Sequence, residues 1–193
     1  MKKRIAIFIS GRGSNMEVIL RQAREGLLRD CCTVALVFSN RPDAPGLKIA
    51  GDLGFPTACI PSAGKKREAF DRDVLDLLAP LKLDYIVLAG YMRMLSPLFI
   101  RAYPRRIINI HPADTRKFQG IGGYAWAFEQ GLKKTCVTVH YVDEGMDTGE
   151  IIAQRELDLR GLDYLEEIEK KGLALEHKMY SEVLKELFEH EQE

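Results

Sequence analysis

The sequence predicts an α/β fold with an open, mostly parallel sheet, an antiparallel C-terminal edge and helices on both faces. Three observations support this prediction. Short apolar runs recur along the chain, a pattern typical of parallel strands covered on both faces. Segments with helical periodicity separate these runs, and such alternation favours a parallel sheet. Two further strand-like segments after residue 135 follow each other across a short loop, which predicts an antiparallel hairpin.

The first half of the chain carries four apolar runs with helical segments between them. We expect strands at residues 5–9, 33–38, 57–60 and 85–89. We expect helices at residues 16–27, 45–53 and 65–78, and one starting near Pro97. Met16, Ile19, Leu20 and Leu27 recur at helical spacing in the first of these, as an amphipathic helix requires.

The second half begins with a short apolar run at residues 107–112, which ends in a proline that cannot continue a sheet ladder. A polar, glycine-rich segment follows at residues 113–123. Strands are expected at residues 136–142 and 151–159, with an acidic loop between them. A long helix at about residues 163–190 should lie across the sheet.

Length and composition indicate one cytoplasmic domain at residues 1–193. A chain of 193 residues can bury a substantial core. The 28 basic and 28 acidic residues cancel, so no global field favours nucleic acid or a membrane. No apolar run reaches the roughly twenty residues that span a bilayer, and no signal peptide is evident. The four cysteines lack metal-ligand spacing and stand in apolar surroundings, so we expect them reduced and buried.

The glycine turn at residues 10–15 predicts an anion site. It joins the first strand to the first helix, where free N–H groups and the positive end of the helix dipole face outward. Ser14 and Asn15 can cap the helix or bind a phosphate. Met16 occupies the place of the third small residue of a dinucleotide fingerprint, and Ser39 stands where an NAD enzyme places an acidic residue. A phosphate monoester is therefore favoured, with a plain tight turn as the alternative.

Asn109 and His111 are candidates for stabilising an oxyanion. They are two residues apart on an expected strand, so their side chains point to the same face. An amide and an imidazole at a strand end can donate hydrogen bonds to an oxygen that gains negative charge. The alternative is a histidine with a purely structural role.

Two loops at strand ends are candidates for a second binding surface. Residues 90–95 form an apolar loop with one arginine, at the edge where open α/β sheets place ligands. Core packing of Met92 and Met94 is the alternative. Residues 143–149 carry three carboxylates within five residues, but the closing glutamate of a calcium loop is missing. We therefore expect no metal there.

Five segments together resemble the phosphoribosylglycinamide formyltransferases, a family of folate-dependent formyltransferases with a Rossmann-like sheet. The resemblance covers nearly the whole chain. Each segment alone is a weak signal, but their order along the chain is specific. They are residues 9–15 (ISGRGSN), 37–40 (VFSN), 87–97 (VLAGYMRMLSP), 109–112 (NIHP) and 139–149 (VHYVDEGMDTG).

The resemblance implies transfer of a formyl group from 10-formyltetrahydrofolate to the amine of glycinamide ribonucleotide in de novo purine synthesis. It assigns Asn109, His111 and Asp147 as catalytic. Asn109 and protonated His111 would donate to the oxyanion formed when the amine attacks. Asp147 would orient the imidazole and raise its pKa, because a nearby opposite charge favours the charged form.

The resemblance also implies binding residues for two small-molecule substrates. Gly13, Ser14 and Asn15 would hold the phosphate of the nucleotide, and Glu176 would contact its ribose. The folate co-substrate would lie against Arg67, Met92, Arg93, Met94, Leu95, Asn109, Asp143, Glu144, Gly145, Met146 and Asp147. We expect no metal and no nucleic-acid partner, and a monomer or homodimer.

The chain departs from the family after its His-Pro pair. Where a Ser-Leu-Leu-Pro-like segment is common, residues 113–120 have the charged sequence ADTRKFQG, and Glu150 replaces a frequent proline. These changes leave the identity of the amine acceptor open. The alternatives are a formyltransferase for an amino sugar or nucleotide sugar, and a 10-formyltetrahydrofolate hydrolase. A ligand-binding module and an NADP oxidoreductase fit fewer of the residues.

Overall fold

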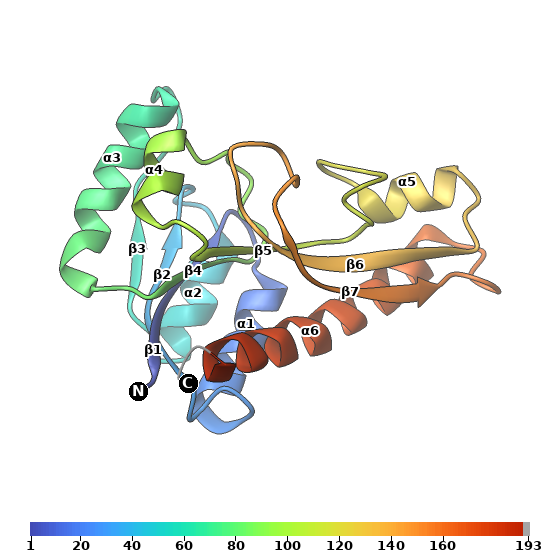
Figure 1. The fold of residues 1–193 in the computed structure, drawn as a ribbon, viewed down its shortest axis with the longest axis horizontal. Coiled ribbons are helices and arrows are strands. Elements are labelled where there is room, and N and C mark those ends of the chain that lie inside the picture. The colour runs from blue at the N-terminus through green and yellow to red at the C-terminus, as the bar shows by residue number, and fades with distance from the viewer. Residues whose placement is uncertain (191–193) are drawn as a thin grey trace.

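The first half of the chain alternates strands with helices, as Figure 1 shows. The computed structural model describes residues 1–190. Its elements here are β1 (Lys3–Ile9), α1 (Ser14–Glu25), β2 (Cys32–Ser39), α2 (Pro45–Asp52), β3 (Thr57–Cys59), α3 (Arg67–Leu78), the 3-10 turn η1 (Ala79–Leu81), β4 (Tyr85–Leu88) and α4 (Pro97–Ala102).

The second half adds one more parallel strand beside β4 and a long hairpin. Its elements are β5 (Ile107–His111), α5 (Gly123–Glu129), β6 (Lys134–Tyr141), β7 (Ile151–Asp158) and α6 (Leu165–His190). In Figure 1 the β6–β7 hairpin extends away from the parallel strands, and α6 runs back along it.

The seven strands form one sheet in the order β3-β2-β1-β4-β5-β6-β7. Strands β1 to β5 pair in parallel. The β5–β6 and β6–β7 pairs are antiparallel. The predicted α/β fold, mostly parallel with an antiparallel C-terminal edge, is therefore confirmed.

Alternation along β1 supplies the apolar cores on the two faces of the sheet. Ile5, Ile7 and Ile9 belong to a core that includes residues of α1 and α6. Ala6 and Phe8 belong to the other core, with residues of α3 and α4. Because successive side chains of a strand point to opposite faces, one uninterrupted apolar run serves both layers.

Three details differ from the sequence-based expectations. Helix α5 was not predicted, because its start follows a glycine-rich segment without clear periodicity. Leu27 lies beyond the end of α1 and is exposed, so it is not on the apolar face of that helix. All four cysteines are free thiols as expected, but only Cys31 and Cys32 are buried.

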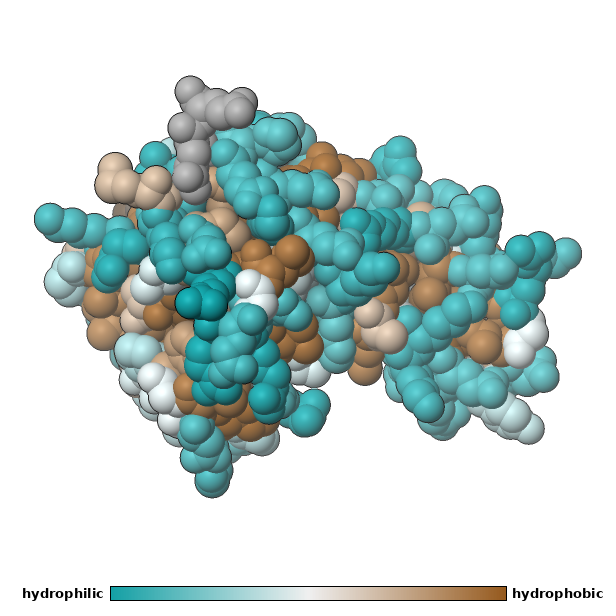
Figure 2. All heavy atoms as spheres, turned by 90° about the horizontal axis from the view of Figure 1, so that it is seen from below, coloured by the Kyte–Doolittle hydropathy of each residue, from teal (hydrophilic) through white to brown (hydrophobic). Residues whose placement is uncertain are grey.

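The molecular surface seen from below in Figure 2 is mainly hydrophilic, with apolar patches between charged side chains. Within residues 1–190, no helix has the length and apolarity needed to cross a bilayer.

Candidate active site

The loops after β1, β2 and β4 are tied together at the point where the strand order of the sheet reverses. The Ser10 hydroxyl donates to Asn40 Oδ1 at 2.6 Å and accepts from the Met92 N–H at 2.8 Å. Such a reversal point is where open α/β sheets bind ligands. One serine thus fixes three loops around the position of a ligand.

The glycine turn after β1 opens into a cavity of about 400 Å³. Gly13 has a left-handed backbone conformation with φ 68° and stands directly before α1. Gly13, Ser14 and Asn15 all line this cavity, as does Glu176 from α6. The four residues expected to bind the nucleotide are therefore brought together, although they come from opposite ends of the chain.

Close packing of α2 on the glycine turn predicts a strong effect of Gly46→Ala. The Gly46 N–H donates to Gly11 O at 3.1 Å. A Cβ at position 46 would lie 2.8 Å from Arg12 O and 2.9 Å from Gly11 O. We expect the unfolding free energy to fall by about 1–3 kcal/mol, because overpacking displaces backbone. Urea unfolding measures this change.

Gly51→Ala in the same helix is the matched control for this prediction. A Cβ there meets nothing within 4 Å. Equal stability of the two variants would show that the close approach of α2 does not constrain the turn.

Arginines stand at the rim of this cavity. Arg12 and Arg41 line it, and both side chains are mostly exposed. Arg41 pairs with Asp43 at 2.9 Å, and this hydrogen-bonded partner raises the pKa of the guanidinium. Both arginines are positively charged groups within reach of an anion at the glycine turn.

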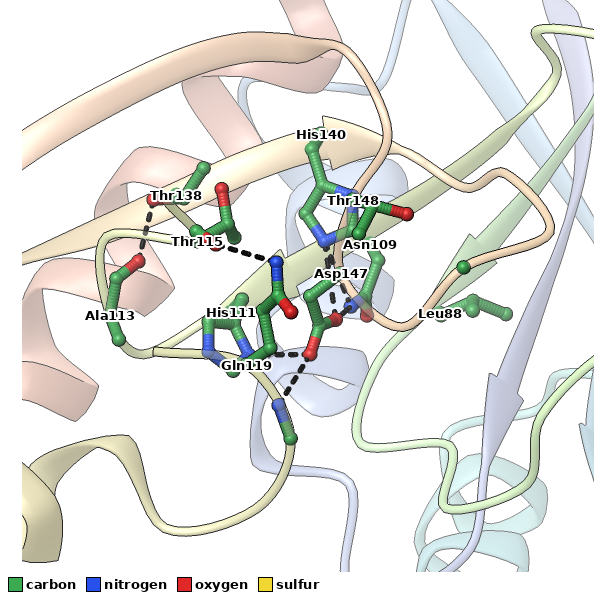
Figure 3. Close-up of polar contacts among 12 residues, drawn as sticks. Leu88, Asn109, His111, Ala113, Thr115, Gln119, Thr138, His140, Asp147 and Thr148 are labelled. Atoms are coloured by element: carbon green, nitrogen blue, oxygen red, sulfur yellow. Dashed lines mark hydrogen bonds and ion pairs between the residues drawn. The ribbon is translucent and has the colours of Figure 1, made fainter. Parts of the chain in front are cut away.

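Asp147 lies among three side chains of the strands, as Figure 3 shows. Its Oδ1 accepts from Asn109 Nδ2 at 3.2 Å, and its Oδ2 is 3.4 Å from His111 Nδ1. The Gly120 N–H donates to Oδ2 at 2.9 Å. The three residues expected to be catalytic are thus in direct contact.

His140 is a further member of this cluster, to which the sequence reasoning assigned no role. It is the β6 partner of Asn109 in the antiparallel register. Its Nε2 lies 3.3 Å from Asn109 Nδ2 and 3.5 Å from Asp147 Oδ1. Its Nδ1 lies 2.8 Å from Tyr141 O, which can only accept, so Nδ1 carries a hydrogen. In the neutral tautomer, Nε2 then accepts from the Asn109 amide.

Burial lowers the pKa of His111, contrary to the expectation that Asp147 would raise it. The residue is only 3% exposed. Loss of hydration outweighs the favourable charge of Asp147, and His140 lowers the pKa further. Both ring nitrogens nevertheless face acceptors, since Nε2 is 3.2 Å from Phe118 O. Both ring nitrogens thus face acceptors that suit an imidazolium, whereas burial disfavours this charged form.

The lowered pKa of His111 predicts a loss of stability in mild acid. The unfolded chain takes up this proton near the ordinary value of 6.5, whereas the folded protein does so only at lower pH. Acidification below pH 6.5 therefore favours the unfolded state. We expect urea unfolding to give a lower unfolding free energy at pH 5.5 than at pH 7.5, and a smaller difference in His111→Asn. Equal pH dependence in both proteins would contradict this assignment.

Asp147 is ionised at neutral pH. Burial raises the pKa of this carboxyl, but the hydrogen bond from the Gly120 N–H and the two histidines, when they are protonated, lower it below its usual range. Asp147 also has a left-handed conformation with φ 52°. A carboxylate is thus fixed between two imidazoles.

A second cavity of about 270 Å³ lies directly beside this cluster. The expected folate residues that line it are Met92, Arg93, Met94, Leu95, Asn109, Asp143, Gly145, Met146 and Asp147. Tyr91, from the predicted loop at residues 90–95, also lines it, as does Ile121, to which the sequence reasoning assigned no role. The two cavities share Gly90 and Met92, so they adjoin.

Two of the expected folate residues lie elsewhere. Arg67 is exposed at the start of α3 and is not among the residues that line the second cavity. Glu144 is likewise absent from the lining and lies 3.6 Å from Arg101. Arg93 does line the cavity, and its guanidinium stacks 4.6 Å from the centre of the Phe70 ring.

The charged segment after Pro112 turns its polar groups away from both cavities. Asp114 binds the guanidinium of Arg116 at 2.9 Å and accepts from Gln154 on β7 at 3.3 Å. The Phe118 ring stacks on Trp126, with ring centres 5.0 Å apart. The segment is therefore anchored to the β6–β7 hairpin, and its backbone reaches His111 and Asp147 through Phe118 and Gly120.

Comparison with known proteins agrees with this geometry. A family model described as formyl transferase matches residues 3–184. A curated phosphoribosylglycinamide formyltransferase from Bacillus subtilis (strain 168) is 39% identical over 186 residues, which cover 96% of this chain and 94% of the relative.

Solved structures show the same fold. Glycinamide ribonucleotide transformylase 1 from Symbiobacterium toebii superposes with a TM-score of 0.91 at 37% identity, covering 98% of this chain and 89% of that one. Phosphoribosylglycinamide formyltransferase from Bacillus halodurans gives 0.90 at 39% identity, covering 96% and 95%.

Proposed function

The chain belongs to the formyl transferase family, and on this premise we propose that it transfers a formyl group from 10-formyltetrahydrofolate to the amine of glycinamide ribonucleotide. This is a step of de novo purine synthesis. Residues 1–193 would act as one formyltransferase domain on two small-molecule substrates.

One observation carries this proposal: the cluster of Asn109, His111 and Asp147 lines one of two adjoining cavities. The cavity at the glycine turn would hold the nucleotide, and the cavity beside Asp147 would hold the folate. An amine and a formyl group that enter from opposite sides would meet next to Asn109 and His111. Such positioning alone supplies much of the acceleration of a two-substrate reaction.

Asn109 and His111 would stabilise the formyl oxygen as it gains negative charge. In the free protein the Asn109 amide faces two partners, Asp147 and His140. Donation to the formyl oxygen therefore requires one N–H to be redirected when substrates bind. Catalytic hydrogen bonds often form only in the substrate complex.

The proton transfers of the proposed reaction can be accounted for without a metal ion. The amine nitrogen forms a bond to the formyl carbon, and the bond from that carbon to the folate nitrogen breaks. The amine loses one proton and the folate nitrogen gains one. His111 and Asp147, with water, would carry this transfer. Negative charge developing beside His111 raises the pKa of the imidazole, so its protonation would accompany the attack.

The position of the charged segment supports the nucleotide over another amine. Asp114, Arg116 and Lys117 distinguish this chain from the pattern that is common in the family, yet the described linings of the two cavities include none of them. The charged side chains of this segment are therefore not part of either proposed substrate site.

The test is to mix the purified protein with 10-formyltetrahydrofolate, with and without glycinamide ribonucleotide. Folate release and the mass of the nucleotide product are followed together. We expect folate release only when the nucleotide is present, together with a formylated nucleotide. Release without nucleotide would instead identify a hydrolase, and folate binding without release would point to another acceptor.

A further inference from the structure

The carboxylate of Glu176 is fixed at both of its oxygens. Asn15 Nδ2 donates to Oε2 at 2.7 Å, and the Tyr124 hydroxyl donates to Oε1 at 2.6 Å. Glu176 is only 7% exposed, yet it lines the cavity at the glycine turn. Its rotamer is therefore set by an element on each side, α1 and α5.

Tyr124 reaches Glu176 through a notch in α6. Gly172 lies one helical turn before Glu176, on the same face of that helix. A Cβ at position 172 would overlap the phenol ring and lie 2.6 Å from its Cε1. Only glycine at this position lets the ring lie flat against α6 with its hydroxyl at the carboxylate.

Tyr124 acts on Glu176 without touching the ligand itself. Tyr124 belongs to α5 and is buried against α6 and β7. It is not among the residues that line either cavity. Burial and the adjacent Glu176 carboxylate raise the pKa of the phenol well above its usual value, so the hydroxyl stays a donor. A carboxylate accepts about four hydrogen bonds, so acceptor capacity remains for a ligand.

The cavity wall at this carboxylate offers acceptors. Asn15 and Glu176 both line the cavity. The remaining lone pairs of the Glu176 carboxylate can accept hydrogen bonds from a ligand. Neighbouring hydroxyl groups match such an acceptor, whereas a phosphate, which is an acceptor itself, does not.

We propose that Tyr124, seated on Gly172, is a positioning residue that aims the Glu176 carboxylate at the hydroxyl pair of the substrate ribose. This inference rests on the proposed function, because it takes the nucleotide as the occupant of that cavity. It adds a specificity role for α5, an element far from the reacting atoms.

The test uses Tyr124→Phe, which removes only the hydroxyl. Binding is measured by calorimetry with glycinamide ribonucleotide and with its 2′,3′-dideoxy analogue. We expect the Kd for the ribonucleotide to rise about tenfold, as for loss of one hydrogen bond to a charged group. The Kd for the dideoxy analogue should not change. In turnover, KM for the nucleotide should rise while kcat and KM for the folate stay the same.

Gly172→Ala is the second variant, since its methyl group would push the ring away from Glu176. It should raise the Kd for the ribonucleotide at least as much, and Gly51→Ala, in open space, should not. Equal weakening of both nucleotides in Tyr124→Phe would indicate general packing and overturn the positioning role. No change in either would also overturn it. If the wild-type protein fails to formylate the nucleotide, the proposed function fails, which is a separate result.

Discussion

Replacing Asp147 with asparagine is expected to lower kcat by about a hundredfold to a thousandfold, or more. The carboxylate lies 3.4 Å from His111 and 3.5 Å from His140, and it accepts from Asn109. Asparagine removes the negative charge that favours an imidazolium at His111. Burial already lowers the pKa of His111, and loss of the Asp147 charge would lower it further.

The fold should tolerate this substitution. Asp147 has a positive φ of 52°, and asparagine adopts that region as readily as aspartate does. Because the two side chains have the same shape, the amide oxygen can still accept from the Gly120 N–H. The variant therefore tests the charge and leaves the loop intact.

Single-turnover kinetics with both substrates would measure the loss, with urea unfolding as the check on folding. Asp52→Asn is the matched control, because Asp52 is exposed on α2 and forms a surface ion pair with Lys48. Near-normal turnover of folded Asp147→Asn would rule out the proposed role of this carboxylate.

Asn109→Ala should reduce kcat by about a hundredfold to a thousandfold, the usual effect of removing an oxyanion donor. The side chain comes from β5, so its backbone is fixed by two neighbouring strands. Alanine removes the amide without disturbing that pairing. The effect should fall on kcat, because donation strengthens as negative charge develops on the formyl oxygen.

Asn109→Asp serves as a second variant, because it keeps the size of the side chain but cannot donate when ionised. Both variants should lose turnover while the Kd for the nucleotide changes little. If Asn109→Ala kept its kcat, the oxyanion would have to be stabilised by His111 or another group.

The fold was predictable because its strands are buried on both faces. Uninterrupted runs such as residues 5–9 leave little ambiguity between strand and loop, and short connections limit the topology. The glycine turn was predictable for a similar reason, since it lies between a strand and a helix. Asn109 and His111 followed from the period of two along a strand.

Other parts of the site depend on information that local sequence does not contain. His140 faces Asn109 through the antiparallel register of β5 and β6, which is set by pairing in three dimensions. Helix α5 starts after a left-handed glycine, Gly122, and is stabilised by packing on α6. A search for helical periodicity therefore does not identify Tyr124.

The direction in which the pKa of His111 shifts also could not be predicted from local sequence. The sequence identifies Asp147 as a favourable neighbour, but the burial that opposes it depends on the whole fold. Arg67, which only the family resemblance suggested, and Glu144 of the acidic loop lie outside the described linings of the two cavities. The motifs thus predicted which residues of the strand ends lie together, whereas the positions of long surface side chains depend on the fold.

The hydrogen bond between Asn15 and Glu176 joins residues 161 positions apart in the chain. A ribosome synthesises proteins from the N-terminus, so the glycine turn emerges long before the helix that completes the nucleotide cavity. Until α6 docks, Asn15 and the Leu88 carbonyl lack their partners Glu176 and Tyr180. A nascent chain therefore lacks the complete cavity in which we propose that the nucleotide binds, so we expect nucleotide binding to report completed folding.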